Sequence, residues 1–372
     1  MHTITFFPIG NADSCLIELE NGRRVVFDFA DMRNRADPKD TRVDLEAELR
    51  KRLGKDKQVE VVAFSHLDQD HIKRATEVFH LDHAAKYQGG DRIRIDTLWV
   101  PAAAILEEGA EDETRIIRQE ARYRLKEGKG IRVFSRPEAL DAWLTGQGID
   151  PRSRRNLISD AGTLSPEFSL GADGVEFFVH SPFAERCPDG KIVVRNNAAL
   201  FMQATFEVSG IKTRLILSAD VKHDVIEDIV RVTRYHGHDE RLLWDINNIP
   251  HHCSYLSLAE EKGREVTEPS DSLRWLYETQ ARHGALVVST SDPIPSIDTV
   301  QPPHRQAAAY YRRAIKPRSG SFVVTMEHPG AADPKPVEIE IKHNGFMLRK
   351  AGLLVGGALA GAAAPRAGAP RA

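Results

Sequence analysis

Short runs of apolar residues, separated by polar turns, recur along most of the chain and predict many strands. Asn21-Gly22 interrupts the run DSCLIELENGRRVVFDFA, and this dipeptide is a strong hairpin signal. Further strands are expected at QVEVVAFS, IDTLWVP and IRVFS. Helices are expected over 43–53 and 112–127, and another is expected to begin at Ser135 with Pro137 near its first turn.

The second half of the chain repeats this style. Strands are predicted at VEFFVHSP, AALFMQATFEV, TRLILSAD, LLWDINNIPHH, ALVVSTS, SFVVTMEH and PVEIEIK. Because helices fall between groups of strands, we expect packed sheets with helices outside, in one α/β domain over residues 1–350. Residues 351–372 are mostly Ala, Gly, Pro and Arg and predict a disordered tail, with an anchor or partner-binding segment as the alternative.

Composition narrows the class of protein. With 41% hydrophobic and 28% charged residues, the 372-residue chain has the make-up of a soluble globular protein. The net charge of −3 gives no general attraction to nucleic acid, so such a partner needs a local basic patch. The three cysteines form no Cys-x-x-Cys pair, and the start of the chain shows no secretory signal. We therefore expect a cytoplasmic protein with no membrane association.

The densest group of chemically active residues is AFSHLDQDHI, which directly follows the apolar run of a predicted strand. His66, Asp68, Asp70 and His71 fall within six positions, and imidazole and carboxylate are the side chains that bind borderline or hard divalent metals. A turn at the end of a rigid strand can direct several of them into one space. A metal site is favoured over a solvated loop with incidental charges.

The segment SHLDQDH resembles the Thr/Ser-His-x-His-x-Asp-His signature of the metallo-β-lactamase fold, with Asp68 in place of the second histidine. This variant is similar to the ComEC-like competence-protein branch. Other segments resemble that branch in the same order, namely FFPIGNADSCLIELENGRRVVFDFA, LGADGVEFFVHSP, RNNAALFMQATFEVSGIKTRLILSAD and INNIPHHCS. The resemblance implies an αββα sandwich of two mixed sheets flanked by helices. It departs at Ala30, Ala219 and Cys253, where the branch has glycine.

The remaining candidate ligands lie in the second half of the chain. Asp220 ends an apolar strand, and the resemblance implies that it bridges two metals, although it could also cap the helix that follows. His251 and His252 are adjacent, and on extended backbone their side chains point opposite ways. We assign His251 to the metal and His252 to the substrate, with the reverse assignment open.

Two further histidines and the catalytic set are assigned with the help of the resemblance. His180 lies between the first motif and Asp220 and is a possible metal ligand. His304, in VQPPHRQ, resembles a late His-Pro element of the branch and is either a substrate contact or acid, or a surface helix start. Asp70, His252 and His304 are the residues expected to act in catalysis.

The predicted metal set is His66, Asp68, Asp70, His71, Asp220 and His251, for one or two divalent ions. A metal lowers the pKa of water towards neutrality and supplies hydroxide as nucleophile, and two metals can stabilise both oxygens of a phosphodiester. A carboxylate at Asp68 shifts preference towards Mn²⁺ or Mg²⁺, although intrinsic affinity still favours Zn²⁺.

A basic helix suggests the substrate. Arg115, Arg118 and Arg122 share one helical stripe within residues 114–136, which hold eight Lys or Arg against two Glu. This stripe is predicted to contact phosphates, or else to be a solvated face. The leading hypothesis is a metal-dependent phosphodiesterase or nuclease, which could serve as an effector in defence. The alternatives are a hydrolase of a small ester, lactone, thioester or cyclic nucleotide, and a non-catalytic interaction module.

Overall fold

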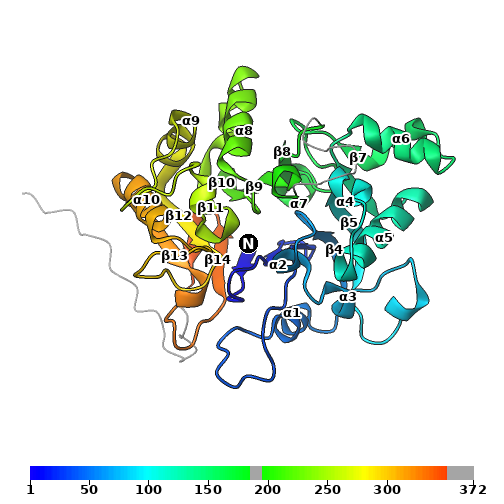
Figure 1. The fold of residues 1–372 in the computed structure, drawn as a ribbon, viewed down its shortest axis with the longest axis horizontal. Helices are drawn as coiled ribbons and strands as arrows, with labels where there is room; N and C mark the ends of the chain where they lie inside the picture. Colours follow the sequence, from blue (N-terminus) through cyan, green and yellow to red (C-terminus); the bar gives the residue numbers. More distant parts are fainter. Residues whose placement is uncertain (185–194, 350–372) are drawn as a thin grey trace, which may run out of the picture.

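A computed structural model of the chain describes residues 1–184 and 195–349. Two sheets form the centre of the domain (Figure 1). The first sheet has the strand order β15-β14-β1-β2-β3-β4-β5-β6-β7, and the second has β13-β12-β11-β10-β9-β8. The predicted tail, residues 351–372, lies outside the described residues.

The strands of the first sheet are β1 (His2–Phe6), β2 (Cys15–Glu18), β3 (Arg24–Phe27), β4 (Gln58–Ala63), β5 (Arg94–Pro101), β6 (Ile131–Phe134), β7 (Ile158–Ser159), β14 (Val337–Lys342) and β15 (Gly345–Leu348). Those of the second are β8 (Val175–Ser181), β9 (Phe201–Val208), β10 (Ile211–Leu217), β11 (Trp244–Asn248), β12 (Ala281–Ser289) and β13 (Ser321–Val324). Both sheets are mixed, because β3 to β7 and β10 to β13 pair in parallel while the other pairs are antiparallel.

The helices are α1 (Leu45–Leu53), α2 (Gln69–Ile72), α3 (Ala75–Val78), α4 (Ala102–Leu106), α5 (Asp112–Glu127), α6 (Glu138–Gly146), α7 (Leu170–Asp173), α8 (His223–Tyr235), α9 (Asp271–Arg274) and α10 (Arg305–Ile315). In Figure 1, α4, α5 and α6 lie beside the first sheet, whereas α8, α9 and α10 lie beside the second. Within the described residues, no helix is both long and apolar enough to cross a membrane.

Alternation along each strand divides the core into layers. On β4, Val61 and Ala63 face the second sheet, whereas Val62 faces the helices. Ile117 and Leu125 of α5 pack on the outer face of the first sheet. A separate outer layer joins α8 and α10 to the second sheet. The predicted sandwich of two mixed sheets flanked by helices is confirmed.

Element positions differ from the sequence prediction in a few places. The strands β7 and β15 were not predicted, since β7 has only two residues and β15 follows the last predicted strand. The helix expected from Ser135 begins at Glu138, because Ser135 has φ of 77° and Pro137 is the residue before the helix. The four-residue helices α2 and α3 are too short for an apolar period to predict, and α2 lies within the motif segment whereas α3 follows it.

Candidate metal centre

The segment that follows β4 turns into the interior. The N–H of Phe64 still donates to the carbonyl of Trp99 on β5, at 2.9 Å. His66 and His71 are then buried, with 2% and 0% of their surface exposed, and their ring centroids lie 4.0 Å apart. A solvated loop therefore does not describe these two histidines.

Four side chains from distant parts of the chain meet beside this turn. Asp13, His71, Asp220 and His252 each offer one ligand atom, and these four atoms lie within 4.8 Å of one another. They come from the β1–β2 loop, α2, the end of β10 and the turn after β11. His71 Nε2 lies 3.3 Å from Asp220 Oδ1 and 3.9 Å from Asp13 Oδ2. All four residues are buried.

Two of these atoms have no hydrogen-bond partner among the residues that the structure describes. They are His71 Nε2 and Asp220 Oδ1, which are buried and lie 3.3 Å apart without the geometry of a hydrogen bond. Buried polar atoms left without a partner are costly, so native proteins rarely keep them. A divalent cation among the carboxylates and imidazoles would satisfy both atoms, and a mixed O/N set suits Mn²⁺ or Zn²⁺. The residues present therefore fit a divalent metal.

Asp28 orients His71 towards this space. Its buried carboxylate accepts hydrogen bonds from the N–H and the hydroxyl of Ser65, each at 2.7 Å, and lies 2.8 Å from His71 Nδ1. With Nδ1–H donating to Asp28, His71 presents the lone pair of Nε2 to the cluster, an arrangement common around metal-binding histidines. Burial alone would lower the pKa of His71, but the carboxylates of Asp28 and Asp220 raise it well above its usual value.

Thr290 orients two other members of the cluster. Its carbonyl lies 2.9 Å from His252 Nδ1, so Nδ1–H donates and Nε2 faces inward. Its hydroxyl donates to Asp13. Asp13 and Thr290 are not among the residues predicted from the sequence, and Asp28 lies there only within the segment that carries the resemblance. A carboxylate directly after the apolar run of β3 was the one available signal for Asp28.

The two adjacent histidines differ in how they stand to the buried cluster. His252 belongs to the buried cluster, with Nε2 at 3.6 Å from Asp220 Oδ2. His251 Nε2 lies 3.7 Å from the same oxygen, but its side chain is 20% exposed. Consecutive positive φ angles of 53°, 52° and 65° at His251, His252 and Cys253 produce this tight turn. His251 therefore lies at the rim of the cluster.

Asp70 lies at the solvent side of the same group. Its Oδ2 is 3.3 Å from His252 Nε2, and its side chain is 33% exposed. Burial opposes ionisation, but the nearby His252 and His71 hold the pKa of Asp70 below its usual value. Asp70 is thus an ionised carboxylate between the buried cluster and solvent.

His66 and Asp68 form a second part of the centre. His66 Nε2 is 3.3 Å from Asp68 Oδ2, and Oδ1 of the same carboxylate accepts from the guanidinium of Arg195. Arg195 also binds Glu107, with Nε 3.1 Å from Oε2. Arg195 and Glu107 were not among the predicted residues, since a local motif cannot show a partner 127 positions away.

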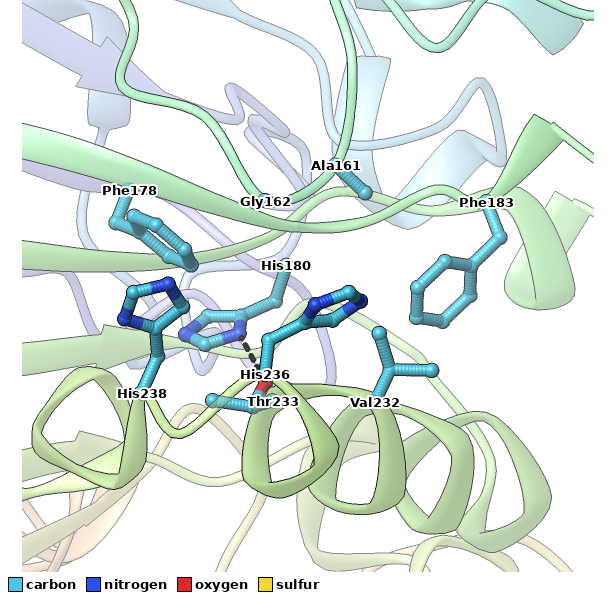
Figure 2. Close-up of a pocket in the computed structure, with 9 residues that line it drawn as sticks. All are labelled: Ala161, Gly162, Phe178, His180, Phe183, Val232, Thr233, His236 and His238. Atoms are coloured by element: carbon cyan, nitrogen blue, oxygen red, sulfur yellow. Dashed lines mark hydrogen bonds between the residues drawn. The ribbon is translucent and has the colours of Figure 1, made fainter.

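His180 lies in a different environment (Figure 2). Its Nε2 is 2.9 Å from the carbonyl of Arg241, and its Nδ1 is 3.3 Å from the hydroxyl of Thr233. It lines a cavity of about 320 Å³ together with Phe178 and His236. Burial lowers the pKa of His180 to about 4, so the ring is neutral at pH 7. Because both nitrogens have protein partners and His180 is not in the four-residue cluster, we do not retain it as a ligand.

His304 supports the turn that holds His251. Its N–H donates to the carbonyl of Cys253 at 3.1 Å, and Nδ1 accepts from the N–H of Tyr255 at 3.4 Å. Its Nε2 lies 3.3 Å from the carbonyl of Val300. Both ring nitrogens are therefore occupied by backbone groups, and only 2% of the residue is exposed. This geometry favours a positioning role over the predicted acid or substrate contact.

The predicted arginine stripe is largely taken up by backbone contacts. The guanidinium of buried Arg118 donates to the carbonyl of Glu107, and Nε of Arg122 donates to the carbonyl of Ile105 at 2.7 Å. These carbonyls lie at the C-terminal end of α4, where cations and donors are stabilising. Of the three arginines, Arg115 is the exposed one. The three arginines of α5 therefore do not form a continuous exposed stripe for binding phosphates.

Substitution of these arginines should separate structural from surface roles. We expect Arg118→Gln to lower the free energy of unfolding by about 1–3 kcal/mol, because a buried charged hydrogen bond to a carbonyl is lost. Arg115→Gln on the same helix should change it by about 0.5 kcal/mol or less. Urea denaturation measures both. Equal effects of the two substitutions would show that the contact with Glu107 does not stabilise the fold.

Metal uptake should release protons. Burial would lower the pKa of His252, but the carboxylates of Asp220 and Asp70 raise it to about 9. A metal takes the neutral imidazole, so binding at pH 7 should expel at least one proton and affinity should rise between pH 7 and 9. Calorimetric titration in buffers of different ionisation enthalpy measures this release. Binding heats that are the same in every buffer would contradict the assignment of His252 as a ligand.

No family model and no curated protein matches the chain. Among solved structures, the metallo-β-lactamase GOB-18 from Elizabethkingia meningoseptica matches 74% of this chain and 86% of its own, with 12% identity and a TM-score of 0.31. The class B3 di-zinc metallo-β-lactamase LRA-12 from an Alaskan soil metagenome matches 74% and 89%, with 11% identity and a TM-score of 0.30. A long form RNase Z from yeast matches 90% of this chain and 41% of its own, with 11% identity and a TM-score of 0.30.

Proposed function

We propose that the protein is a metal-dependent hydrolase of the metallo-β-lactamase fold, with a phosphodiester, most simply a nucleic acid, as substrate. The observation that carries this proposal is the buried group Asp13, His71, Asp220 and His252, in which His71 Nε2 and Asp220 Oδ1 lack hydrogen-bond partners within residues 1–184 and 195–349. Such a group is costly to bury unless it has a ligand to hold. A non-catalytic interaction module would have no need of it.

Each residue has a stated role in this proposal. Asp13, His71, Asp220 and His252 hold the ion, and Asp28 and Thr290 keep the two imidazoles in the ligating tautomer. When bound, a divalent ion supplies Lewis-acid stabilisation and lowers the pKa of water. Asp70, ionised and 33% exposed, is placed to accept a proton from the attacking water. His251, at the rim, faces the substrate.

The phosphodiester substrate is supported by the ordered motif resemblance and by one cation at the centre. The side chain of Arg195 is 26% exposed, and a guanidinium fork matches phosphate oxygens well. The second candidate is a small ester or cyclic nucleotide. The contacts of Arg118 and Arg122 with α4 favour it, because they remove the extended basic track that a long polyanion would use.

Comparing the rates of hydrolysis of polynucleotides and of a small phosphodiester distinguishes the two candidate functions. Purified protein, loaded with Mn²⁺ or Zn²⁺, would be assayed on single-stranded DNA, plasmid DNA, RNA and bis(p-nitrophenyl) phosphate. A wild-type protein that cleaves a polynucleotide, with no cleavage by Asp70→Asn, would support the nuclease. Turnover of the small diester alone would support the second candidate. Asp245→Asn, at a half-buried carboxylate on β11, serves as the control and should remain active. Stoichiometric metal without turnover of any substrate would contradict a hydrolase.

A further inference from the structure

The candidate metal centre has a second part beside the four-residue cluster, formed by His66 and Asp68 and called here the His66–Asp68 end. This end already contains a cation, the guanidinium of Arg195. The guanidinium of Arg195 binds Asp68 on one side and Glu107 on the other, with its Nε 3.2 Å and 3.1 Å from the two oxygens of Glu107. Arginine stays protonated in proteins, so this positive charge is permanent. One carboxylate oxygen of Asp68 is thereby engaged, and the other faces His66 Nε2 at 3.3 Å.

The backbone around Arg195 is tied to the motif itself. Arg195 begins the short helix Arg195–Ala198, and Ala198 packs in the core layer of the first sheet. Two residues later, the N–H of Leu200 donates to the carbonyl of Ser65 at 3.0 Å. Arg195 therefore contacts Asp68 from a segment whose backbone is hydrogen-bonded to Ser65, the residue before His66.

A divalent ion between His66 and Asp68 would lie beside the guanidinium of Arg195, and two like charges repel at short range. The cavity of about 10 Å³ next to His66 is lined by Leu67, Glu107 and Arg195 but not by Asp68, so it adjoins this pair rather than lying within it.

The two ends of the centre also differ in ligand number. Among the described residues, one group of three or more ligand atoms converges within 4.8 Å, and it comprises Asp13, His71, Asp220 and His252. His66 and Asp68 are not in it. Among the described residues, His66 Nε2 is buried without a hydrogen-bond partner, 3.3 Å from Asp68 Oδ2, and Oδ1 of Asp68 accepts from Arg195.

We propose that this protein binds one divalent ion, in the Asp13–His71–Asp220–His252 group, and that Arg195 is the resident cation at the His66–Asp68 end. The inference rests on the proposed function, since it concerns the number of ions at the same site. Arg195 then does by a fixed charge what a second ion would otherwise do: it neutralises Asp68 and offers N–H donors towards a bound phosphate. Chelators can remove the one ion but leave this second positive charge in place.

Metal stoichiometry tests the inference without relying on activity. Metal-free full-length protein would be titrated with Zn²⁺ by calorimetry, with bound metal counted by mass spectrometry after gel filtration. We expect one ion per wild-type chain. Removing the guanidinium in Arg195→Met should free Asp68 and His66 and raise the count to two, whereas Arg195→Lys should keep it at one. With Mn²⁺, electron paramagnetic resonance should show an isolated ion in the wild type and a coupled pair in Arg195→Met.

A second arginine offers a matched control. Arg241 pairs with Glu176 at side-chain exposures of 23% and 13%, close to the 26% and 12% of Arg195 and Glu107. Arg241→Met should therefore disturb a comparable ion pair and leave the count at one. Arg195→Gln repeats the measurement with a polar side chain, and circular dichroism verifies that each variant is folded.

Two results would overturn the inference while leaving the proposed hydrolase intact. Two ions in the wild-type chain would show that Arg195 does not replace a metal. A count of one in folded Arg195→Met and Arg195→Gln would show that the guanidinium is not what limits the number of ions. A wild-type chain that binds no ion would contradict the proposed function itself, and this inference with it.

Discussion

Asp220→Asn should abolish stoichiometric metal binding and hydrolysis together. Both oxygens of Asp220 face imidazoles, with Oδ1 3.3 Å from His71 Nε2 and Oδ2 3.6 Å from His252 Nε2. An amide keeps the size of the side chain but loses the negative charge and one acceptor oxygen. We expect metal affinity to fall by at least about 100-fold and turnover to fall to background. Metal content after gel filtration and the rate of diester cleavage measure the two effects.

The substituted protein should still fold. The core layers between the sheets and beneath the helices are apolar and do not include Asp220. Wild-type protein should melt at a higher temperature with metal, because an ion at about 100 times its dissociation constant adds about 2.7 kcal/mol. Asp220→Asn should show no such shift. A variant that retains one ion per chain would mean that Asp220 is not a ligand.

Asp28→Asn should weaken metal binding although Asp28 itself does not reach the ion. Its carboxylate accepts from the N–H and hydroxyl of Ser65 and receives His71 Nδ1–H. An amide has one acceptor oxygen and would present donors to the same groups, so His71 would lose its fixed tautomer. Loss of such an orienting contact costs about 10–100-fold in metal affinity. Competition with a fluorescent chelator measures this change.

Asp31 provides the control for that substitution. Asp31 is also a buried carboxylate, but it pairs with Arg35 and Arg74 rather than with the cluster. Asp31→Asn should therefore affect stability while leaving metal affinity within about threefold of wild type. If both variants bind metal as tightly as the wild type, the contact between Asp28 and His71 is not needed for ligation.

Local patterns along the sequence were sufficient for most of the fold. The apolar run in QVEVVAFS identified β4, and Asn21-Gly22 identified the turn between β2 and β3. The helix expected over 112–127 is α5, and its Ile117 and Leu125 are buried against the first sheet. These features depend on neighbours in the chain, so they can be read without a structure.

By itself, then, the sequence determined the two-sheet layering, the elements named above and the dense motif from His66 to His71, because each is encoded by residues close together in the chain. The tertiary structure decided which ligands meet. Asp13 joins the cluster because Thr290, 277 positions away, binds its carboxylate. His252 lies within the cluster and His251 at its rim, both with Nε2 within 4 Å of Asp220 Oδ2, because of a turn at positive φ that the assumption of extended backbone could not anticipate. Arg195 reaches Asp68 across 127 residues, and contacts between such distant segments form only when the sheets bring strand ends together.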